Sequence, residues 1–502
     1  MRHDLSDRTP ATVDQILEGL DTDQREAVTA PPGVVVVRAG AGSGKTTVLT
    51  RRIAWRVASE SASPDHVLAI TFTRQAATEM RTRLRRFGID GNPQIHTFHA
   101  LGLRLLIQRA ADTDRPKPLV VTNRMAVLSG ALGADANQSQ LAGIANAIDH
   151  ATVRMVTGRG IEAALAASGI QRDVTREQFE RIVHRYEESK RKRGVVDTND
   201  LIAHVVRDAR RDPRFVQSMR HQFRHVSVDE AQDMNPLQYE FLRLLVGDEP
   251  DVFVVGDPNQ AIYGFNGADN TLFDELPGLG AGARVVTLPS NYRCTPQVVD
   301  AASRLLRNGG QEIEAVSRRP NGRAVAFVGC ENEFAERNVI VRELRRMRDA
   351  CGTWNLLAVL VRVNAVADDI SEFLAAQGIP VRSGRRGPEW SAAIAQATSL
   401  TSRETLGIWS SDVLDSGDYD PSNPEYEIAS RVREFLDDNR SGTIDGRAFG
   451  SWLTTSVDRT EVEGVEVMTF HAAKGREWFG VVVAAAETGY LPHSSARTAA
   501  QK

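Results

Sequence analysis

A glycine-rich turn between an apolar run and a helix-like segment carries the clearest chemical signature in the chain. Four consecutive valines, Val34–Val37, lead into this turn, and Lys45 and Thr46 end it. Glycines let the N–H groups of such a turn point inward at phosphate oxygens, and the following helix N-terminus adds positive potential. Lys45 can then reach the β- and γ-phosphates of a nucleotide, and the Thr46 hydroxyl can bind Mg²⁺. The residues expected to line the site are Ala41, Gly42, Ser43, Gly44, Lys45, Thr46 and Thr47.

The strict pattern for such a loop is G-x-x-x-x-G-K-[ST], and this chain has Ala39 at the first position. The alternative is a glycine-rich turn that binds no ligand. The flanking strand and helix patterns favour the phosphate site.

Two adjacent carboxylates, Asp229 and Glu230, follow a second apolar run that starts at His225. A lone Asp-Glu pair is usually part of a solvated loop. Directly after a buried strand, and with a phosphate loop upstream, the first carboxylate is placed to hold Mg²⁺ and the second to take a proton from an attacking water. The pair therefore predicts hydrolysis of a nucleoside triphosphate, with Thr46 and Asp229 as the metal-binding residues.

A third polar segment follows the apolar run 251–256. Gln260 is a candidate sensor of the γ-phosphate or of its water. Tyr263 and Phe265 alternate, so both could project from one side of an extended segment and stack on unpaired bases without reading their sequence. The alternative is that the two aromatic rings pack in the core beneath a turn, and for either residue alone this alternative is favoured.

Composition limits the class of protein. The chain has 502 residues, of which 41% are hydrophobic and 25% charged, and its net charge is −4, so any nucleic-acid site has to be local. The three cysteines are too few and too scattered for a disulfide framework or a CxxC metal site. We expect no signal peptide at residues 1–7 and no membrane span, since apolar runs such as 481–486 are short. The expected location is therefore the cytoplasm.

Short apolar runs separated by helical patterns predict an α/β fold built on parallel sheets. The first sheet is expected from the runs 34–37, 67–72, 225–229, 251–256 and 284–288, and the second from the runs 323–328, 357–361, 465–469 and 480–484. Between about 100 and 224 only helix-like segments occur. The predicted domains are a first sheet domain over 1–105 and 196–282, a mainly helical insertion over 106–195, a second sheet domain over 283–381 and 464–502, and a small insertion over 382–463.

An ordered set of short motifs resembles the superfamily 1 DNA helicases of the UvrD/Rep type. Besides the segments above, the motifs lie at residues 20–28, 71–77, 96–99, 290–293, 361–365 and 469–478. The resemblance implies two RecA-like doubly wound domains of the P-loop NTPase type, each with an insertion. It also implies ATP and Mg²⁺ as cofactors and single-stranded and partly duplex DNA as partners. The implied activity is nucleoid-associated 3′-to-5′ translocation that unwinds duplexes in DNA repair or replication.

The resemblance assigns nucleotide roles to four further residues. Gln24 matches a glutamine that recognises adenine, although it could equally be the capping-box partner of Asp21, and both roles are compatible. Tyr292 matches an aromatic residue that packs on the adenine, and Arg293 matches an arginine finger that reaches the γ-phosphate from the second sheet domain. Glu477 matches a residue near the ATP sugar. The positions that match the single-strand track are Phe72, Thr97, His99, Tyr263, Phe265, His471 and Lys474.

Several positions depart from the family pattern. Asn266 and Thr47 stand where arginine is usual, Arg476 stands where leucine is usual, and the 382–463 insertion is short. The sequence also stops before a final Thr-Arg-Ala motif that contributes a second arginine finger. These departures keep a second hypothesis open, namely an ATP-responsive single-strand-binding protein with little hydrolysis. The basic run 190–193 and the arginines that follow Phe72 are either DNA-phosphate contacts or solvated helix faces.

Overall fold

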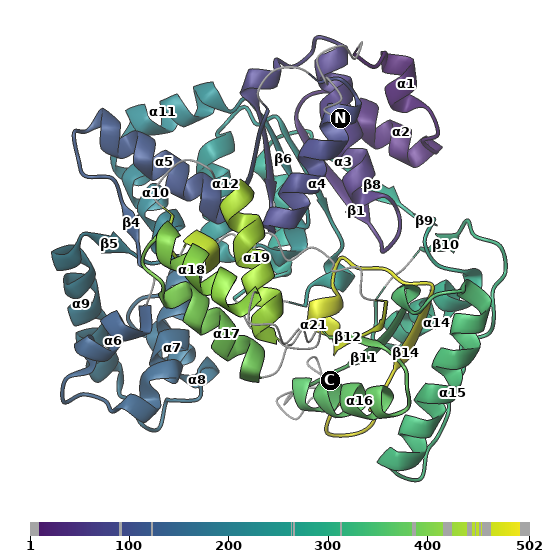
Figure 1. The fold of residues 1–502 in the computed structure, drawn as a ribbon. Coiled ribbons are helices and arrows are strands. Elements are labelled where there is room, and N and C mark those ends of the chain that lie inside the picture. Colours follow the sequence, from purple (N-terminus) through teal and green to yellow (C-terminus); the bar gives the residue numbers. More distant parts are fainter. Residues whose placement is uncertain are drawn as a thin grey trace. The chain divides into compact units, whose positions relative to one another are not determined.

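The computed structural model describes residues 10–89, 93–121, 124–262, 264, 267–311, 314–383, 388–414, 424–438, 444–446, 448–450, 453 and 463–491. The chain divides into two compact units, Met1–Val325 and Ala326–Lys502, each described by itself below (Figure 1). None of the helices in these ranges is both long and apolar enough to cross a lipid bilayer.

A six-stranded parallel sheet forms the centre of the first unit, with the strand order β3-β2-β6-β7-β1-β8. The strands are β1 (Val34–Ala39), β2 (Val67–Thr71), β3 (Gln94–Thr97), β6 (His225–Val228), β7 (Val252–Gly256) and β8 (Arg284–Leu288). Because all strands run the same way, the loops that leave their carboxyl ends gather at one edge of the sheet. The polar residues predicted from the sequence follow β1, β6 and β7 at that edge.

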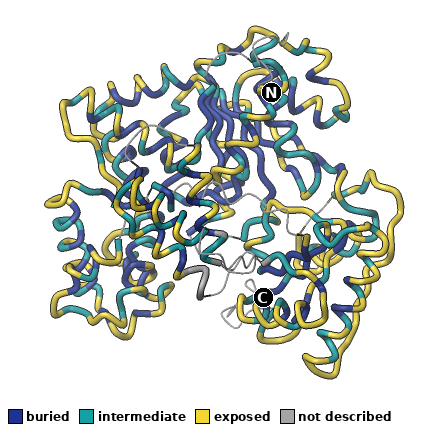
Figure 2. Tube along the Cα trace, in the orientation of Figure 1, coloured by how far each residue is buried: buried dark blue, intermediate teal, exposed yellow. Residues whose placement is uncertain are grey.

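Both faces of the sheet are covered by helices, which explains why its central strands are apolar runs without polar alternation. Val34 and Val36 point to one core, and Val35 and Val37 to the other. The central strands are buried along most of their length (Figure 2). Helices α5 (Phe98–Asp112), α10 (Asp200–Arg211), α11 (Pro213–Gln222) and α12 (Pro236–Val246) cover the first face. Helices α1 (Val13–Leu17), α2 (Thr22–Thr29), α3 (Lys45–Ala58) and α4 (Arg74–Arg86) cover the second face.

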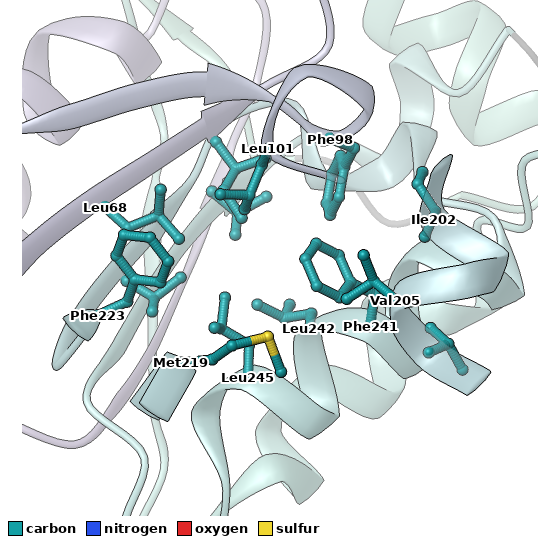
Figure 3. Packing of buried hydrophobic residues seen from close by; sticks show 14 of the residues in the cluster. Leu68, Phe98, Leu101, Ile202, Val205, Met219, Phe223, Phe241, Leu242 and Leu245 are labelled. Carbon is teal, nitrogen blue, oxygen red and sulfur yellow. The ribbon is translucent and has the colours of Figure 1, made fainter. Parts of the chain in front are cut away.

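The core on the first face is rich in large side chains. Phe98 of α5 packs against Phe241 of α12, with ring centroids 6.4 Å apart. Leu68 from the sheet and Met219 from α11 belong to the same cluster (Figure 3). This packing holds α5, which begins directly after β3, against the sheet.

The segment predicted as a helical insertion is helical and has its own core. Its helices are α6 (Arg124–Leu132), α7 (Leu141–Val153), α8 (Gly160–Ala167) and α9 (Arg176–Arg193). A two-residue parallel pair, β4 (Leu119–Val120) with β5 (Val195–Val196), joins the two chain segments that lead into and out of it. The insertion is therefore a subdomain with a common base at these two short strands.

The first unit extends further along the chain than the predicted first sheet domain, which ended at residue 282. Strand β8 pairs with β1, with Val285 opposite Val36, so the run 284–288 belongs to the first sheet as its grouping predicted. Helix α14 (Pro296–Asn308) follows, and the unit continues to Val325. The residues just after β8 are thereby placed beside the loop that follows β1.

The second unit contains a smaller parallel sheet with the order β12-β13-β11-β14. Its strands are β11 (Leu357–Val361), β12 (Val381–Ser383), β13 (Val465–Thr469) and β14 (Gly480–Val483), and its covering helices are α15 (Glu333–Cys351) and α16 (Asn364–Ala376). A separate core joins α17 (Pro388–Ser399), α18 (Arg403–Leu414) and α19 (Pro424–Asp438) within the predicted 382–463 insertion. Two parallel α/β sheets confirm the predicted fold class.

One predicted strand in this part of the chain was wrong, and one strand was missed. The run 323–328 forms no strand and is exposed along its length, with Phe327 90% exposed. Its apolar, β-branched and aromatic residues favour a strand locally, but a strand also needs a partner, and no described strand pairs with it. Conversely, no strand was predicted at β12, whose last two residues, Arg382 and Ser383, begin the predicted 382–463 insertion. Their pairing with Glu466 and Val467 of β13 stabilises the extended backbone.

A buried ionic cluster at the amino end of the first sheet anchors the helix behind the phosphate loop. Asp251 accepts hydrogen bonds from Arg56 of α3 at 3.0 Å and contacts Nδ1 of His225 at 2.6 Å. Burial tends to raise the pKa of the Asp251 carboxyl, but the hydrogen bonds from His225 and Arg56 outweigh it and lower the pKa to about 2. Asp251 therefore ties the far end of α3 to the strand ends of β6 and β7.

We predict that Asp251→Asn destabilises the protein by about 2–3 kcal/mol at pH 7, because Arg56 stays buried without its charged partner. Since the folded-state pKa of Asp251 lies below its usual value, its contribution is complete above about pH 4 and is lost as the pH falls towards 2. Chemical denaturation should show that the difference in the free energy of unfolding between wild type and Asp251→Asn becomes smaller as the pH falls from about 4 towards 2. The control is Asp274→Asn, which breaks the exposed pair with Arg38 and should cost less than about 1 kcal/mol. Equal effects of the two variants would contradict the assignment.

Candidate active site

The turn after β1 has the geometry of a phosphate-binding loop. Gly44, with φ +88°, precedes the first residue of α3, and Gly42 has φ +69°, both in the left-handed region that favours glycine. Ser43 is buried, and its hydroxyl donates to the carbonyl of Gly40 at 2.7 Å. The hydroxyl of Thr47 accepts from Arg83 of α4 at 3.3 Å. The loop is thus held by its own backbone and by the neighbouring helix.

The predicted catalytic residues meet at this loop. Lys45 Nζ lies 3.4 Å from the carbonyl of Ala39 and 4.0 Å from Glu230 Oε2. The Thr46 hydroxyl donates to Asp229 Oδ2 at 3.3 Å. The ends of β1 and β6 therefore bring together a cation, a hydroxyl and two carboxylates, as the sequence predicted.

The carboxylate pair is electrostatically costly. Asp229 is 3% exposed, and burial together with the neighbouring charge of Glu230 raises the pKa of its carboxyl to about 6, against the opposing effect of Lys45. Glu230 has φ +51°, a left-handed conformation that costs a non-glycine residue of the order of 1 kcal/mol. Strain and charge repulsion of this kind are typical of sites where a ligand supplies the missing compensation.

The donor set fits Mg²⁺. The Thr46 hydroxyl and the Asp229 carboxylate face one another, and both are hard oxygen donors. Among the described residues no group of three or more His, Cys, Asp or Glu side chains could hold a metal, so further ligands would be phosphate and water oxygens. This arrangement matches the preference of Mg²⁺ for a few protein oxygens together with substrate phosphates.

Two glutamines connect the carboxylates to the end of β7. The amide of Gln232 donates to Glu230 Oε2 at 2.6 Å, and its oxygen accepts from the backbone N–H of Asp257 at 2.9 Å. Gln260 donates to Asp257 Oδ2 at 2.6 Å. The predicted sensor Gln260 is therefore linked to Glu230 through Asp257 and Gln232. The sequence prediction missed Gln232, although its place two residues after Glu230 in a polar motif was a usable signal.

The segment after β8 is hydrogen-bonded to the phosphate loop. The Asn291 amide donates to the carbonyl of Ala41 at 2.7 Å, and its oxygen accepts from the backbone N–H groups of Arg293 and Cys294. The Tyr292 N–H donates to the carbonyl of Gly42 at 2.9 Å. A Cβ atom added at Gly42 would lie 2.6 Å from the Cβ of Arg293. Arg293 is thus placed against the loop, and the buried Asn291 that places it was missed as a site residue.

Arg293 lies in the first compact unit, after strand β8, which pairs with β1. The resemblance assigned it to the second sheet domain, and that assignment stays a prediction. Arg293 therefore reaches the loop from the same sheet that carries Lys45. Its side chain is exposed.

Gln24, Asp21 and Tyr292 lie together beside the loop. Asp21 caps α2 and Gln24 is its capping-box partner, which confirms the local alternative. The Gln24 amide also donates to the carbonyl of Ser43 in the phosphate loop at 2.8 Å. This position is compatible with the predicted role of Gln24 in recognising adenine. The Tyr292 hydroxyl donates to Asp21, and the ring remains 42% exposed. An exposed aromatic ring next to a phosphate loop is a suitable platform for a base.

Three predicted DNA residues lie near the start of α5. Phe72 is half-buried and packs edge-on against Phe98, with centroids 5.4 Å apart. Thr97 caps α5 through a hydrogen bond from the N–H of Ala100. His99 is half-buried, and burial lowers the pKa of its imidazole, against a hydrogen bond with Asn199 that raises it. Thr97 and Phe72 therefore have structural contacts besides any contact with DNA.

The remaining predicted residues are distributed differently. His471 and Lys474 lie on and just after α21 (Phe470–Ala473) of the second unit, and Glu477 is exposed nearby in the chain. Arg476, which replaces the usual leucine, donates to Glu466 at 2.9 Å. Trp478 and Arg382 also donate to this buried carboxylate, so Arg476 has a structural role. Tyr263, Phe265 and Asn266 lie outside the described residues.

The basic run 190–193 is not a uniform DNA-facing surface. Lys190 is 2% exposed and pairs with Asp200 at 2.6 Å and with Asp197 at 3.1 Å. Lys192 pairs with Glu188 on its own helix. A run of basic residues therefore contains one lysine that stabilises the base of the insertion.

Two family models match the chain. The UvrD/REP helicase N-terminal domain matches residues 20–278, and the UvrD-like helicase C-terminal domain matches residues 286–385. The first match covers the loop after β1, the carboxylates after β6 and Gln260. The chain belongs to the UvrD/Rep helicase family.

Relatives within this family extend the match. ATP-dependent DNA helicase UvrD2 of Mycobacterium tuberculosis H37Rv is 32% identical over 530 residues, covering 96% of this chain and 75% of the relative. DNA helicase II of Escherichia coli K12 is 30% identical over 382 residues, which is 74% of this chain and 52% of that protein. UvrD1 of M. tuberculosis H37Rv is 31% identical over 399 residues, which is 74% of this chain and 50% of that protein.

We predict that Asn291→Ala lowers the free energy of unfolding by about 1–3 kcal/mol, because the Ala41 carbonyl and two backbone N–H groups lose a buried partner. The variant should also show a smaller rise in melting temperature on addition of Mg-ATP, since the phosphate loop loses its support. Thermal unfolding with and without Mg-ATP measures both effects. Asn308→Ala, at the exposed end of α14, is the matched control. An unchanged Mg-ATP effect in Asn291→Ala would show that the segment after β8 does not support the loop.

Proposed function

We propose that the protein is an ATP-dependent DNA translocase and helicase that moves 3′ to 5′ on single-stranded DNA and acts in DNA repair or replication. The observation that carries this proposal is the convergence of Lys45, Asp229, Glu230 and the Asn291-anchored Arg293 segment on one phosphate loop. Membership of the UvrD/Rep family supports DNA as the polymer on which the protein acts.

Each residue has a role that its contacts allow. Lys45, half-buried at the loop, binds the β- and γ-phosphates. Glu230, held by Gln232 and aimed at the site, accepts a proton from the attacking water. Gln260 senses whether the γ-phosphate is present through the hydrogen-bonded series Asp257, Gln232 and Glu230. Thr46 and Asp229 would hold Mg²⁺, which supplies neutralising charge at the phosphates.

The remaining roles are those that the resemblance assigns, and the contacts of Gln24, Tyr292 and Arg293 at the loop are compatible with them. Gln24 and Tyr292 bind the adenine beside the loop, and Arg293 stabilises charge that develops on the γ-phosphate. The resemblance also assigns the sugar contact to Glu477. It assigns the single strand to Phe72, Thr97, His99, Tyr263, Phe265, His471 and Lys474, residue types that can bind it by stacking and phosphate contacts without reading its sequence.

We predict that single-stranded DNA stimulates ATP hydrolysis by at least about tenfold, which a phosphate-release assay with an oligothymidylate measures. Lys45→Ala should abolish turnover. Glu230→Gln should lower it by about 10²–10⁴-fold while ATP binding persists, since only the general base is lost. Lys192→Ala, a surface change in the insertion, is the control. ATP-dependent DNA affinity without phosphate release would instead identify a single-strand-binding protein that uses ATP as a ligand.

A second prediction concerns direction. Duplexes with a 3′ single-stranded tail should be separated in the presence of Mg-ATP, and duplexes with only a 5′ tail should not. Fluorescence dequenching of a labelled displaced strand measures both substrates side by side. Preference for the 5′ tail would reverse the proposed polarity, and separation without ATP would reject coupling to hydrolysis.

A further inference from the structure

Helix α7 of the helical insertion contacts two segments that carry proposed DNA- and ATP-responsive residues. One is the start of α10, where Asn199 is hydrogen-bonded to His99 of α5. The other is the connection from β7 to α13 (Thr271–Glu275), which contains Gln260. Both contacts lie within the first unit. These contacts are polar or tightly packed, so they constrain the orientation of α7 relative to both segments as well as its distance from them.

The first contact runs through Asp149. Its Oδ1 accepts a hydrogen bond from the Asn199 amide at 2.7 Å, and its Oδ2 accepts from Arg124 at 2.7 Å. Asn199 is in turn hydrogen-bonded to His99. Asp149 therefore fixes the amide of Asn199, and that amide holds the imidazole of His99.

The same network is anchored in the base of the insertion. Arg124 also donates to the Tyr186 hydroxyl at 3.3 Å and lies 3.9 Å from Asp197. Asp197 pairs with the buried Lys190. A displacement of the insertion would thus alter the partner of Asn199 and, through it, His99.

The second contact lies at the end of α7. A Cβ atom at Gly267 would lie 2.4 Å from Cγ2 of Val153, so helix and connection touch with no room for a methyl group. Arg154 pairs with Asp269 at 3.5 Å. The N–H of Asp269 donates to the carbonyl of Met234, just past the carboxylate motif, at 2.9 Å. The end of α7 is therefore fixed to a connection that is itself bonded to the nucleotide-site segment.

We infer that Asp149 and Arg154 are positioning residues through which α7 holds the insertion against these two segments, so that they set the affinity with which single-stranded DNA stimulates ATP turnover. The inference rests on the proposed function. Neither residue touches the nucleotide loop, so their loss acts on the response to DNA and not on basal hydrolysis.

The test measures ATP hydrolysis against oligothymidylate concentration for wild type, Asp149→Ala, Arg154→Ala and Arg154→Lys. The control is Arg181→Ala, which breaks an ion pair of the same kind with Asp135 elsewhere in the insertion. We expect the alanine variants at 149 and 154 to need about tenfold more DNA for half-maximal stimulation, the size of effect that one lost charge-assisted hydrogen bond produces. Their basal rate should stay within about twofold of wild type, and Arg154→Lys should recover most of the response because it keeps the cation.

Half-maximal concentrations equal to those of wild type and Arg181→Ala would overturn the inference. So would a loss of basal and stimulated rates in the same proportion, because that pattern reports misfolding alone. A wild-type chain that DNA does not stimulate would instead reject the proposed function, on which the inference depends.

Discussion

The constraint on which the site depends is the confinement of two carboxylates beside one ammonium group at the edge of a buried sheet. Asp229 is nearly inaccessible, next to Glu230, and Lys45 lies 4.0 Å from Glu230. Such a group of charges is unfavourable until phosphates and a divalent cation complete it. The scaffold has to hold these charges in place before any ligand binds. The parallel strands, the ionic cluster around Asp251 and the hydrogen bond from Asn291 to the loop do this.

Several parts of the same scaffold contact the site or the segments next to it. The segment after β8 reaches the loop from one side, and Gln232 connects the carboxylates to the end of β7 on the other. Helix α7 adds contacts to Asn199 and to the connection after β7. Since each connection is a buried or close contact, a change at one position is transmitted as a rearrangement rather than absorbed.

Much of this organisation follows from local sequence rules. Runs of β-branched residues predicted the central strands, and the glycines and carboxylates at their ends predicted the catalytic group, because parallel strands place those ends together. What failed depended on distant partners. The apolar run 323–328 is rich in strand-forming residues, but no described strand pairs with it. The place of Arg293 in the first unit likewise depends on the pairing of β8 with β1. Lys190 resembled a surface cation because its burial by Asp197 and Asp200 is a tertiary property. Gln232 and Asn291 were missed because their roles depend on hydrogen bonds to distant backbone groups, the Asp257 N–H and the Ala41 carbonyl, which the sequence alone does not specify.

The central claim, that a nucleotide binds between the loop after β1 and the segment after β8, is tested most directly by hydrogen–deuterium exchange with and without Mg-ATP. We predict that peptides covering 39–47 and 290–294 gain protection together, and that a peptide covering the carboxylates at 229–233 follows them. Protection absent from these peptides, or confined to one of the first two, would contradict the account.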